Sequence, residues 1–275
     1  MMNRTLLSIA LLALWLPTLT SSPPDLQART RQDFDRYAAA TVERIVRESQ
    51  PHGSFLYLQH ASSDNGAAAL SRLRRGELIY ERLETRDGNG EEMEIHDGLL
   101  HHWLGAAFVQ GVSVEEALEL VQDYDNHAEI FPEVEQSRLL SENGDTFRAF
   151  LRFRKHKVIT VVMNTEHEAR YVRVAPDRAY SLSHSTRVQE VEDAGTSSEK
   201  ELPEGEGHGF MWAMNSYWRF LERDGGIYIE CESITLTRTI PFLLRWIVGP
   251  FVNDVPRQSL RNLLEISRDE LSANR

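Results

Sequence analysis

The stretch that decides the fold is Gly207–Arg238, which reads GHGFMWAMNSYWRFLERDGGIYIECESITLTR. It consists of two runs rich in aromatic and β-branched residues, joined by Asp224-Gly225-Gly226. Asp-Gly between apolar runs predicts a β-hairpin, because both residues tolerate the positive φ of a primed turn. An apolar segment, 240–252, and an amphipathic helix follow. A wide hairpin before a long apolar helix indicates a curved antiparallel sheet that holds the helix and encloses a cavity.

The C-terminal helix is predicted from its capping residues and its apolar stripe. Asp254 is suited to the N-cap, and Pro256 is tolerated in the first turn, where its missing N–H costs nothing. Segment 240–252 is expected to form a helical turn or two and to break at Gly249-Pro250. It is either a mobile gate over the cavity or a rigid connector, and it is too short to span a membrane. The stripe is formed by Leu260, Leu263, Leu264 and Leu271.

Alternating patterns predict a strand, a helix and then a series of strands in the region from residue 99 onward. The helix follows a capping box, in which Ser113 accepts from the backbone N–H of Glu116 and Glu116 reaches back. The acidic loop 192–206 is expected to be a solvated, mobile connection. The strands are predicted at 99–112, 134–141, 146–154, 156–172, 178–191, 208–221 and 227–238.

The residues before 99 are less regular. They predict a helix over 29–50, a short helix over 61–76, and a strand and turn over 77–94. We interpret 29–98 as an N-terminal extension of a main domain over 99–275. The sequence also allows the extension to be a small separate module.

The N-terminus has the features of a targeting segment. Arg4 supplies a positive charge, Leu6–Leu16 forms an apolar run, and Leu26-Gln-Ala28 fits a cleavage site. The sequence therefore predicts a signal peptide over 1–28 and export to the periplasm or the medium. An uncleaved anchor is the alternative, but the apolar run is short for a bilayer span and Pro17 interrupts it.

The amino-acid composition argues against some classes of binding partner. Of the 275 residues 41% are apolar and 26% charged, and the formal net charge is −12. This negative charge argues against a nucleic-acid partner and against electrostatic binding to anionic membranes, although a transient membrane contact is left open. The single cysteine, Cys231, lies in an apolar run and is expected to be a buried, inert thiol. The oligomeric state cannot be inferred.

The order of a strand, a helix, six strands and a C-terminal helix resembles the helix-grip fold of the START-like, or SRPBCC, superfamily. Residues from about 99 to 272 are similar to bacterial START-like proteins of unknown function, through the segments HHWLGAAFVQGV, QDYDNHAEIFPEV, STRVQEVEDAG, the hairpin quoted above and GPFVNDVP. The resemblance implies an α+β fold with an apolar tunnel that holds a lipid or another hydrophobic small molecule. Some members of this superfamily are transfer proteins and others are cyclases or hydrolases, so the fold alone does not decide the activity.

Period-two alternation places one set of large side chains from strand 208–221 on a single face. That face is either a ligand-binding wall or a core surface packed against the C-terminal helix. The candidate ligand-binding residues are Phe210, Trp212, Met214 and Trp218, together with Leu244, Ile247 and Phe251 from the apolar segment that follows.

Glu230 and Glu232 project from the same strand face and allow two interpretations. Facing carboxylates in a buried site would suit acid–base chemistry. The favoured interpretation is an ion-pair ladder on the outer face of the sheet, with partners among Arg148, Arg152, Arg187 and Arg219.

The histidines show no spacing typical of a metal site, since the adjacent His101 and His102 point to opposite faces of a strand. We therefore predict neither a metal nor a cofactor, and no catalytic residue. The predicted function is non-catalytic binding, or transfer, of a hydrophobic molecule. The alternatives are a cyclase- or hydrolase-type enzyme with Glu230, Glu232 or a histidine as general base, and a structural or interaction protein whose cavity is filled by its own side chains.

Overall fold

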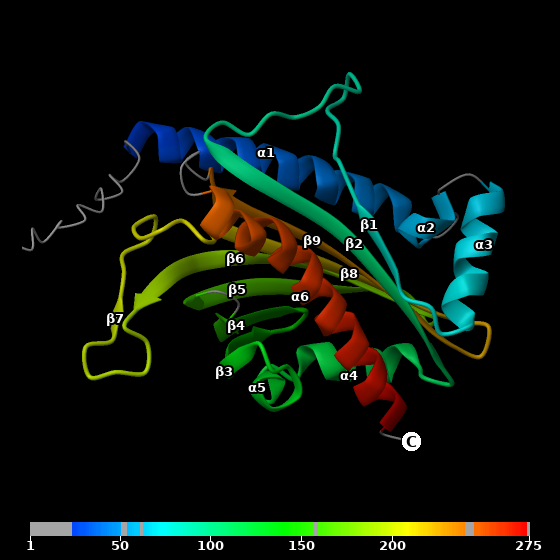
Figure 1. The fold of residues 1–275 in the computed structure, drawn as a ribbon. Helices are drawn as coiled ribbons and strands as arrows, with labels where there is room; N and C mark the ends of the chain where they lie inside the picture. The colour runs from blue at the N-terminus through cyan, green and yellow to red at the C-terminus, as the bar shows by residue number, and fades with distance from the viewer. Residues whose placement is uncertain (1–23, 51–53, 61–62, 157–158, 240–244, 274–275) are drawn as a thin grey trace, which may run out of the picture.

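The computed structural model of the chain describes residues 24–50, 54–60, 63–156, 159–239 and 245–273. In this part the chain forms three layers: a long N-terminal helix, an antiparallel sheet and a long C-terminal helix (Figure 1). The two helices cover opposite faces of the sheet. The arrangement confirms the α+β helix-grip architecture expected from the sequence.

The described strands form one sheet in the order β1-β2-β9-β8-β6-β5-β4-β3, and β7 pairs with β6. Every predicted strand is present, with ends that differ by a few residues. The strands are β1 (Ile79–Arg82), β2 (Gly98–Gln110), β3 (Val134–Asn143), β4 (Thr146–His156), β5 (Thr160–Ala175), β6 (Arg178–Glu192), β7 (Lys200–Glu201), β8 (Ala213–Arg223) and β9 (Gly226–Arg238).

The β8–β9 hairpin confirms the turn predicted from Asp-Gly. Asp224 and Gly225 separate the paired residues Arg223 and Gly226, and their φ angles are 58° and 78°. Positive φ at both central positions is the geometry of a primed two-residue turn. The first strand of the hairpin begins at Ala213 and not at residue 208, because the segment before it bends through Gly207 and Gly209, whose φ angles are 98° and 74°.

The C-terminal helix, α6 (Arg245–Ala273), is continuous. The predicted break at Gly249-Pro250 and the predicted N-cap at Asp254 are therefore wrong, since these residues lie inside the helix. An internal proline removes one backbone hydrogen bond and disfavours the preceding turn. Helical stability in proteins comes mainly from packing of an apolar face, and here that packing outweighs the local penalty.

The close approach of α6 to the sheet depends on a small residue in β2. Leu260 and Leu264 of the predicted apolar stripe are buried against β2 and β9. A Cβ added at Gly105 of β2 would collide with the side chain of Leu264. Gly105 therefore lets the helix lie directly on the strand.

The segment between β2 and β3 holds two short helices, α4 (Val114–Gln122) and α5 (His127–Ile130). The capping box is confirmed at the start of α4, where the Ser113 side chain accepts from the Glu116 N–H and the Glu116 carboxylate accepts from the Ser113 N–H. These helices lie at one end of α6 (Figure 1).

The N-terminal extension contains α1 (Pro24–Glu48), α2 (Tyr57–His60), α3 (Ser63–Arg74) and β1. In α1, Phe34, Tyr37 and Ile45 are buried in one cluster with residues of β2, β6, β8 and β9. β1 pairs with β2 at the sheet edge. The extension thus shares a hydrophobic core with the sheet.

The acidic segment 192–206 is mostly exposed, as predicted, but it is tied to the sheet and is not a free connection. Its β7 residues pair with β6, and Leu202 is buried. Glu199 forms an ion pair with Arg152 of β4 at 2.9 Å. A paired strand and a charge partner hold this segment in place despite its composition.

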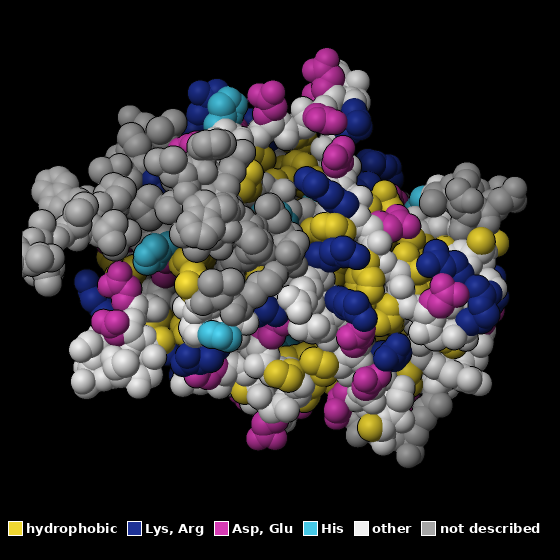
Figure 2. Space-filling view, viewed as in Figure 1, with side chains coloured by type: hydrophobic (Ala, Val, Ile, Leu, Met, Phe, Trp, Pro, Cys, Tyr) yellow, Lys and Arg dark blue, Asp and Glu magenta, His cyan; other side chains and the backbone are white. Residues whose placement is uncertain are grey.

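No helix in the described ranges combines the length and the apolar character needed to cross a membrane. On the face that carries α6, basic and acidic side chains are interspersed (Figure 2), as in the pairs Arg261–Glu265 and Arg268–Asp269.

Candidate functional site

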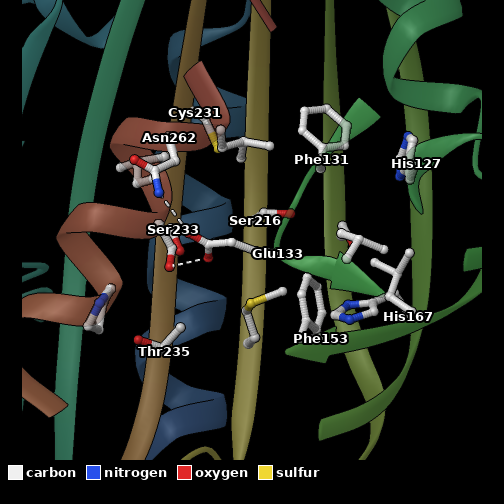
Figure 3. Close-up of a pocket in the computed structure, with 18 of the residues that line it drawn as sticks. His127, Phe131, Glu133, Phe153, His167, Ser216, Cys231, Ser233, Thr235 and Asn262 are labelled. Atoms are coloured by element: carbon white, nitrogen blue, oxygen red, sulfur yellow. Dashed lines mark hydrogen bonds between the residues drawn. The ribbon is translucent and has the colours of Figure 1, made fainter. Parts of the chain in front are cut away.

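A cavity of about 320 Å³ lies between α6 and the sheet (Figure 3). Strands β4, β5, β6, β8 and β9 form its floor, and α6 with the segment from α4 to β3 covers it. Its lining is mainly apolar and includes the aromatic side chains of Phe131, Phe153 and Trp218. The volume lies at the lower end of the range of small-molecule sites. The described side chains thus leave the interior open, and they do not form the filled core of the third alternative.

The structure brings three of the predicted ligand-binding residues together. Phe210, Met214 and Trp218 all line the cavity. Leu244 lies outside the described residues. Ile247 and Phe251 belong to the first turns of α6, for which the backbone alone is described. Their predicted contacts with a ligand stay a prediction.

Trp212 does not line the cavity, although alternation groups it with Phe210. It packs against the cluster that includes Leu236 and α1, and its carbonyl accepts from Arg31 at 3.0 Å. The reason is that regular alternation starts only at Ala213. Side chains before that point follow the bend and not the strand.

A buried carboxylate directs Phe210 into the cavity. Glu190 of β6 accepts hydrogen bonds from the backbone N–H groups of His208 and Phe210, each at 2.8 Å. The bend at Gly207 and Gly209 makes this close approach possible, because both glycines have positive φ. The segment 207–211 is therefore anchored as a rim that contributes Phe210 and Met211 to the lining.

Small hydroxyl residues form the middle of the cavity floor. Ser183 of β6 pairs with Ser216 of β8, which pairs with Ser233 of β9, so the three lie in one row across adjacent strands. Thr235 lies two residues beyond Ser233 on the same face of β9. Because these side chains are short, they leave space that larger residues would fill.

This row was not predicted from the sequence. A usable signal was present, since Ser181, Ser183 and Ser185 alternate in β6, and Ser233, Thr235 and Thr237 alternate in β9. Alternating small polar residues on a face that is otherwise apolar indicate a wall that borders a space.

Two histidines line the cavity and are electrically neutral near pH 7. Burial lowers the pKa of His167 to about 4, with a further contribution from the charge of His184. Burial also lowers the pKa of His127, against the opposing effect of its hydrogen bond to the Leu120 carbonyl. Both rings pack edge-on against phenylalanines, His167 against Phe153 and His127 against Phe131.

The charged groups that line the cavity neutralise each other where α6 meets the start of β3. Glu133 pairs with Lys155 of β4. The same carboxylate accepts from Ser259 at 2.6 Å and from Asn262 at 2.8 Å (Figure 3). Glu133 therefore fastens α6 to the strands beneath it and leaves no unpaired charge among the described lining residues.

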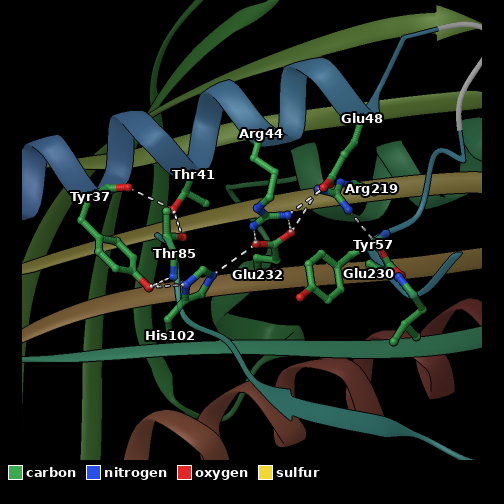
Figure 4. Close-up of polar contacts among 11 residues, drawn as sticks. Tyr37, Thr41, Arg44, Glu48, Tyr57, Thr85, His102, Arg219, Glu230 and Glu232 are labelled. Atoms are coloured by element: carbon green, nitrogen blue, oxygen red, sulfur yellow. Dashed lines mark hydrogen bonds and ion pairs between the residues drawn. The ribbon is translucent and has the colours of Figure 1, made fainter. Parts of the chain in front are cut away.

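Glu230 and Glu232 lie on the opposite face of the sheet, beneath α1 (Figure 4). Each is 1% exposed. Arg219 contacts both, and Arg44 of α1 binds Glu232 at 2.5 Å. The predicted partners Arg148, Arg152 and Arg187 instead pair with other acids.

The ion-pair interpretation of Glu230 and Glu232 is thus confirmed for the face of the sheet and for the partner Arg219, but α1 covers this face and buries the pairs. Glu230 also accepts from the backbone N–H groups of Tyr57 and Leu58 at the start of α2. Neither carboxylate can reach a ligand in the cavity, so the structure contradicts their role as a general base for that ligand.

Cys231 faces the cavity and is fully buried, and burial raises the pKa of its thiol well above the usual value. This confirms the expectation of a buried thiol, and a raised pKa disfavours the reactive thiolate. Within the described part of the chain, no group of three or more potential metal ligands comes together.

No family model matches the chain, and no curated protein is significantly similar to it in sequence. Solved structures with a similar chain path include a protein from Thermus thermophilus (13% identity, 62% of this chain and 97% of that one, TM-score 0.45). A STAR-related lipid transfer protein from Xanthomonas axonopodis shares 14% identity over 69% of this chain and 98% of its own, with a TM-score of 0.40. The Zhui aromatase/cyclase from a Streptomyces species shares 14% over 64% and 93%, with a TM-score of 0.40.

These proteins include a lipid-transfer protein and an enzyme. At such low identity and TM-score, the similarity is confined to the fold and supports no choice between their activities. The function of this chain has to be inferred from its own cavity.

Proposed function

We propose that the protein reversibly binds a hydrophobic small molecule, such as a lipid, in the cavity between the sheet and α6, without covalent chemistry. The observation that carries the proposal is the open, largely apolar cavity lined by Phe131, Phe153 and Trp218. A dry apolar space forfeits dispersion contacts, which a ligand of matching shape restores. Burial of the ligand's apolar surface adds a gain of roughly 25 cal/mol per Å² before the costs of association.

The chemistry of the lining supports binding over catalysis. His127 and His167 are buried, and both Tyr124 and Tyr171 are engaged, with their hydroxyl groups 2.8 Å apart. The Tyr171 hydroxyl donates to the Val121 carbonyl at 3.1 Å, so this pair is held in place by the last turn of α4. The strongest catalytic candidates from the sequence, Glu230 and Glu232, lie on the other face.

The proposal is tested by organic extraction of the purified protein and mass spectrometry of what is released. Ser216→Phe places an aromatic ring in the cavity floor, so the variant should lose the co-purified molecule. Ser141→Phe is the matched control, since Ser141 lies on an exposed part of β3 and the cavity is untouched. Absence of any apolar molecule from the native protein, together with no uptake of added lipid, would refute the proposal.

We further propose that the chain is exported and that residues 1–28 are removed. Arg29 and Thr30 of α1 contact His96, so a cut after Ala28 would preserve these contacts with the extension. The intact mass of the protein recovered from its native host tests this directly. A mass that includes residues 1–28 would contradict it.

A further inference from the structure

The polar groups on the cavity floor are uncharged hydroxyls, and one of them has no partner among the described residues. The Thr235 side chain lines the cavity, and the residue is 8% exposed. Its hydroxyl has no hydrogen-bond partner among the described residues. Such a buried group is uncommon in native proteins and calls for an explanation.

The unpaired hydroxyl of Thr235 lies beside the serine hydroxyls of the cavity floor. It continues the serine row, because Thr235 follows Ser233 by two residues and therefore shares its face of β9. Figure 3 shows Ser216, Ser233 and Thr235 on the neighbouring strands that form the cavity floor. Adjacent strands are about 4.8 Å apart, so one polar group of a ligand can reach hydroxyls on two strands at once.

A further acceptor is provided by the wall. The Thr165 hydroxyl donates its proton to the Leu151 carbonyl at 3.0 Å, so it must accept from His167 Nε2 at 2.9 Å. The Nε2–H tautomer leaves Nδ1 of His167 as an unprotonated acceptor. The lining thus includes hydroxyl groups and an imidazole ring, all of them neutral.

The charged residues of the lining also favour an uncharged ligand. Glu133 and Lys155 are the charged residues among the described lining, and they pair with each other. A ligand carboxylate or ammonium would have to leave water without a free counter-charge, and this is far more costly than burying a neutral polar group.

We propose that the cavity selects hydrophobic molecules that carry an uncharged hydrogen-bonding group, such as an alcohol, and that this group binds at Thr235 and the row Ser183, Ser216 and Ser233. The inference rests on the proposed function and adds the ligand's chemical class. Ordered water that permanently satisfies the hydroxyls is the competing explanation, and under it a polar ligand group gains nothing at this floor.

The test compares ten-carbon probes by isothermal titration calorimetry at pH 7.5. The probes are decane, 1-decanol, decanoate and decylammonium. In the native protein 1-decanol should bind at least roughly tenfold more tightly than either ion, because of their uncompensated desolvation. Equal or tighter binding of decanoate would overturn the proposal.

Variants of Thr235 locate the polar group. Thr235→Val removes the hydroxyl at nearly constant volume, so it should weaken 1-decanol binding by roughly fivefold, as expected for one net hydrogen bond, and leave decane binding unchanged. Thr235→Ser keeps the hydroxyl and should retain most of the affinity for 1-decanol. A thermal melt of each variant verifies that it is folded.

The outcomes separate the two proposals. If Thr235→Val and Ser216→Ala both leave the affinity for 1-decanol unchanged while all apolar probes still bind, the selectivity is refuted and the binding function stands. If Thr235→Val weakens decane and 1-decanol equally, the hydroxyl serves only the shape of the cavity and the selectivity is again refuted. If no probe binds to the native protein, both proposals fail.

Discussion

The two faces of the sheet bury polar groups in opposite ways. Beneath α1, Glu48, Glu230 and Glu232 meet Arg44 and Arg219 in a largely buried cluster of paired charges. Beneath α6, the polar groups of the floor are neutral hydroxyls and border an open cavity. The same strands, β8 and β9, supply residues to both faces by simple alternation.

The difference shows which face is structural and which is available to a ligand. Buried charges are tolerated only when partners are fixed in place, and a helix held by ion pairs fixes them. Neutral hydroxyls can be left open to a space at a smaller cost, because a ligand or water can complete their hydrogen bonds. The charged face therefore holds the extension to the sheet, and the neutral face is the one that we propose as the binding surface.

The largest effect is expected from removing the central cation of the charged face. Arg219 is 1% exposed and contacts Glu48 at 2.7 Å, Glu232 at 3.1 Å and Glu230 at 3.4 Å. Arg219→Met would leave Arg44, which pairs with Glu48 and Glu232, as the remaining arginine of the cluster. We expect the free energy of unfolding in urea to fall by about 3–5 kcal/mol, as for other broken buried ion pairs.

Arg148→Met is the matched control, because Arg148 pairs with Glu166 at the surface, where its side chain is 48% exposed. Loss of an exposed pair should cost about 1 kcal/mol or less. Adding Glu230→Gln to Arg219→Met should recover part of the stability, since it removes one unpaired charge. Equal costs for the two arginine variants would contradict the assignment of the α1 face as the charged structural layer.

An intermediate effect is expected from pH, because the pKa of Glu230 is raised and the pKa of Glu232 is lowered from the usual value of a glutamate. Burial raises the pKa of Glu230 to about 7, although Arg219 and two backbone N–H groups oppose the shift. Burial would also raise the pKa of Glu232, but the hydrogen bond from His102 and the charges of Arg219 and Arg44 outweigh it and lower the pKa to about 2. With three carboxylates and two guanidinium groups, the cluster is neutral when Glu230 alone carries a proton.

The sign of each contribution follows from the unfolded value of about 4.3 for a glutamate. Glu230 stabilises the fold fully below that value, and its contribution is lost as pH rises through about 7. Glu232 contributes fully above it, and its contribution is lost as pH falls toward 2.

Between pH 5 and 8 the native protein should lose stability on the order of 2 kcal/mol that Glu230→Gln does not lose, measured by urea unfolding at each pH. Parallel pH profiles would disprove the raised pKa.

Much of the fold could be predicted because its signals are local. Asp224-Gly225 specifies a turn by its own backbone preferences, and Ser113 with Glu116 specifies a helix start within four residues. Each depends on the chain next to it. The predicted break at Gly249-Pro250 failed because a local penalty competed with packing of distant residues on α6, which no local pattern reports.

The site was only partly predictable for the same reason. Alternation found Met214 and Trp218, but it failed for Trp212, where the strand had not yet begun. The sequence also could not show that Glu232 is buried, because its partner Arg44 lies 188 residues earlier in the chain. Which face of a strand is sealed depends on the helix that covers it.

The smallest effect compares the two faces most directly. A Thr→Val substitution should lower the free energy of unfolding on one face and raise it on the other. On the α1 face, the Thr41 hydroxyl donates to the Tyr37 carbonyl at 3.0 Å and lies 2.8 Å from the Thr85 hydroxyl. Thr41→Val removes both contacts and leaves Thr85 with a lost partner, so it should lower the free energy of unfolding by about 1–2 kcal/mol. On the α6 face, Thr235→Val removes a buried hydroxyl that has no partner among the described residues, so the ligand-free protein should become more stable by up to about 1 kcal/mol. Urea unfolding of both variants after delipidation measures the two signs. If both substitutions destabilise the protein equally, the Thr235 hydroxyl is already satisfied, and the contrast between a completed face and an open one no longer holds.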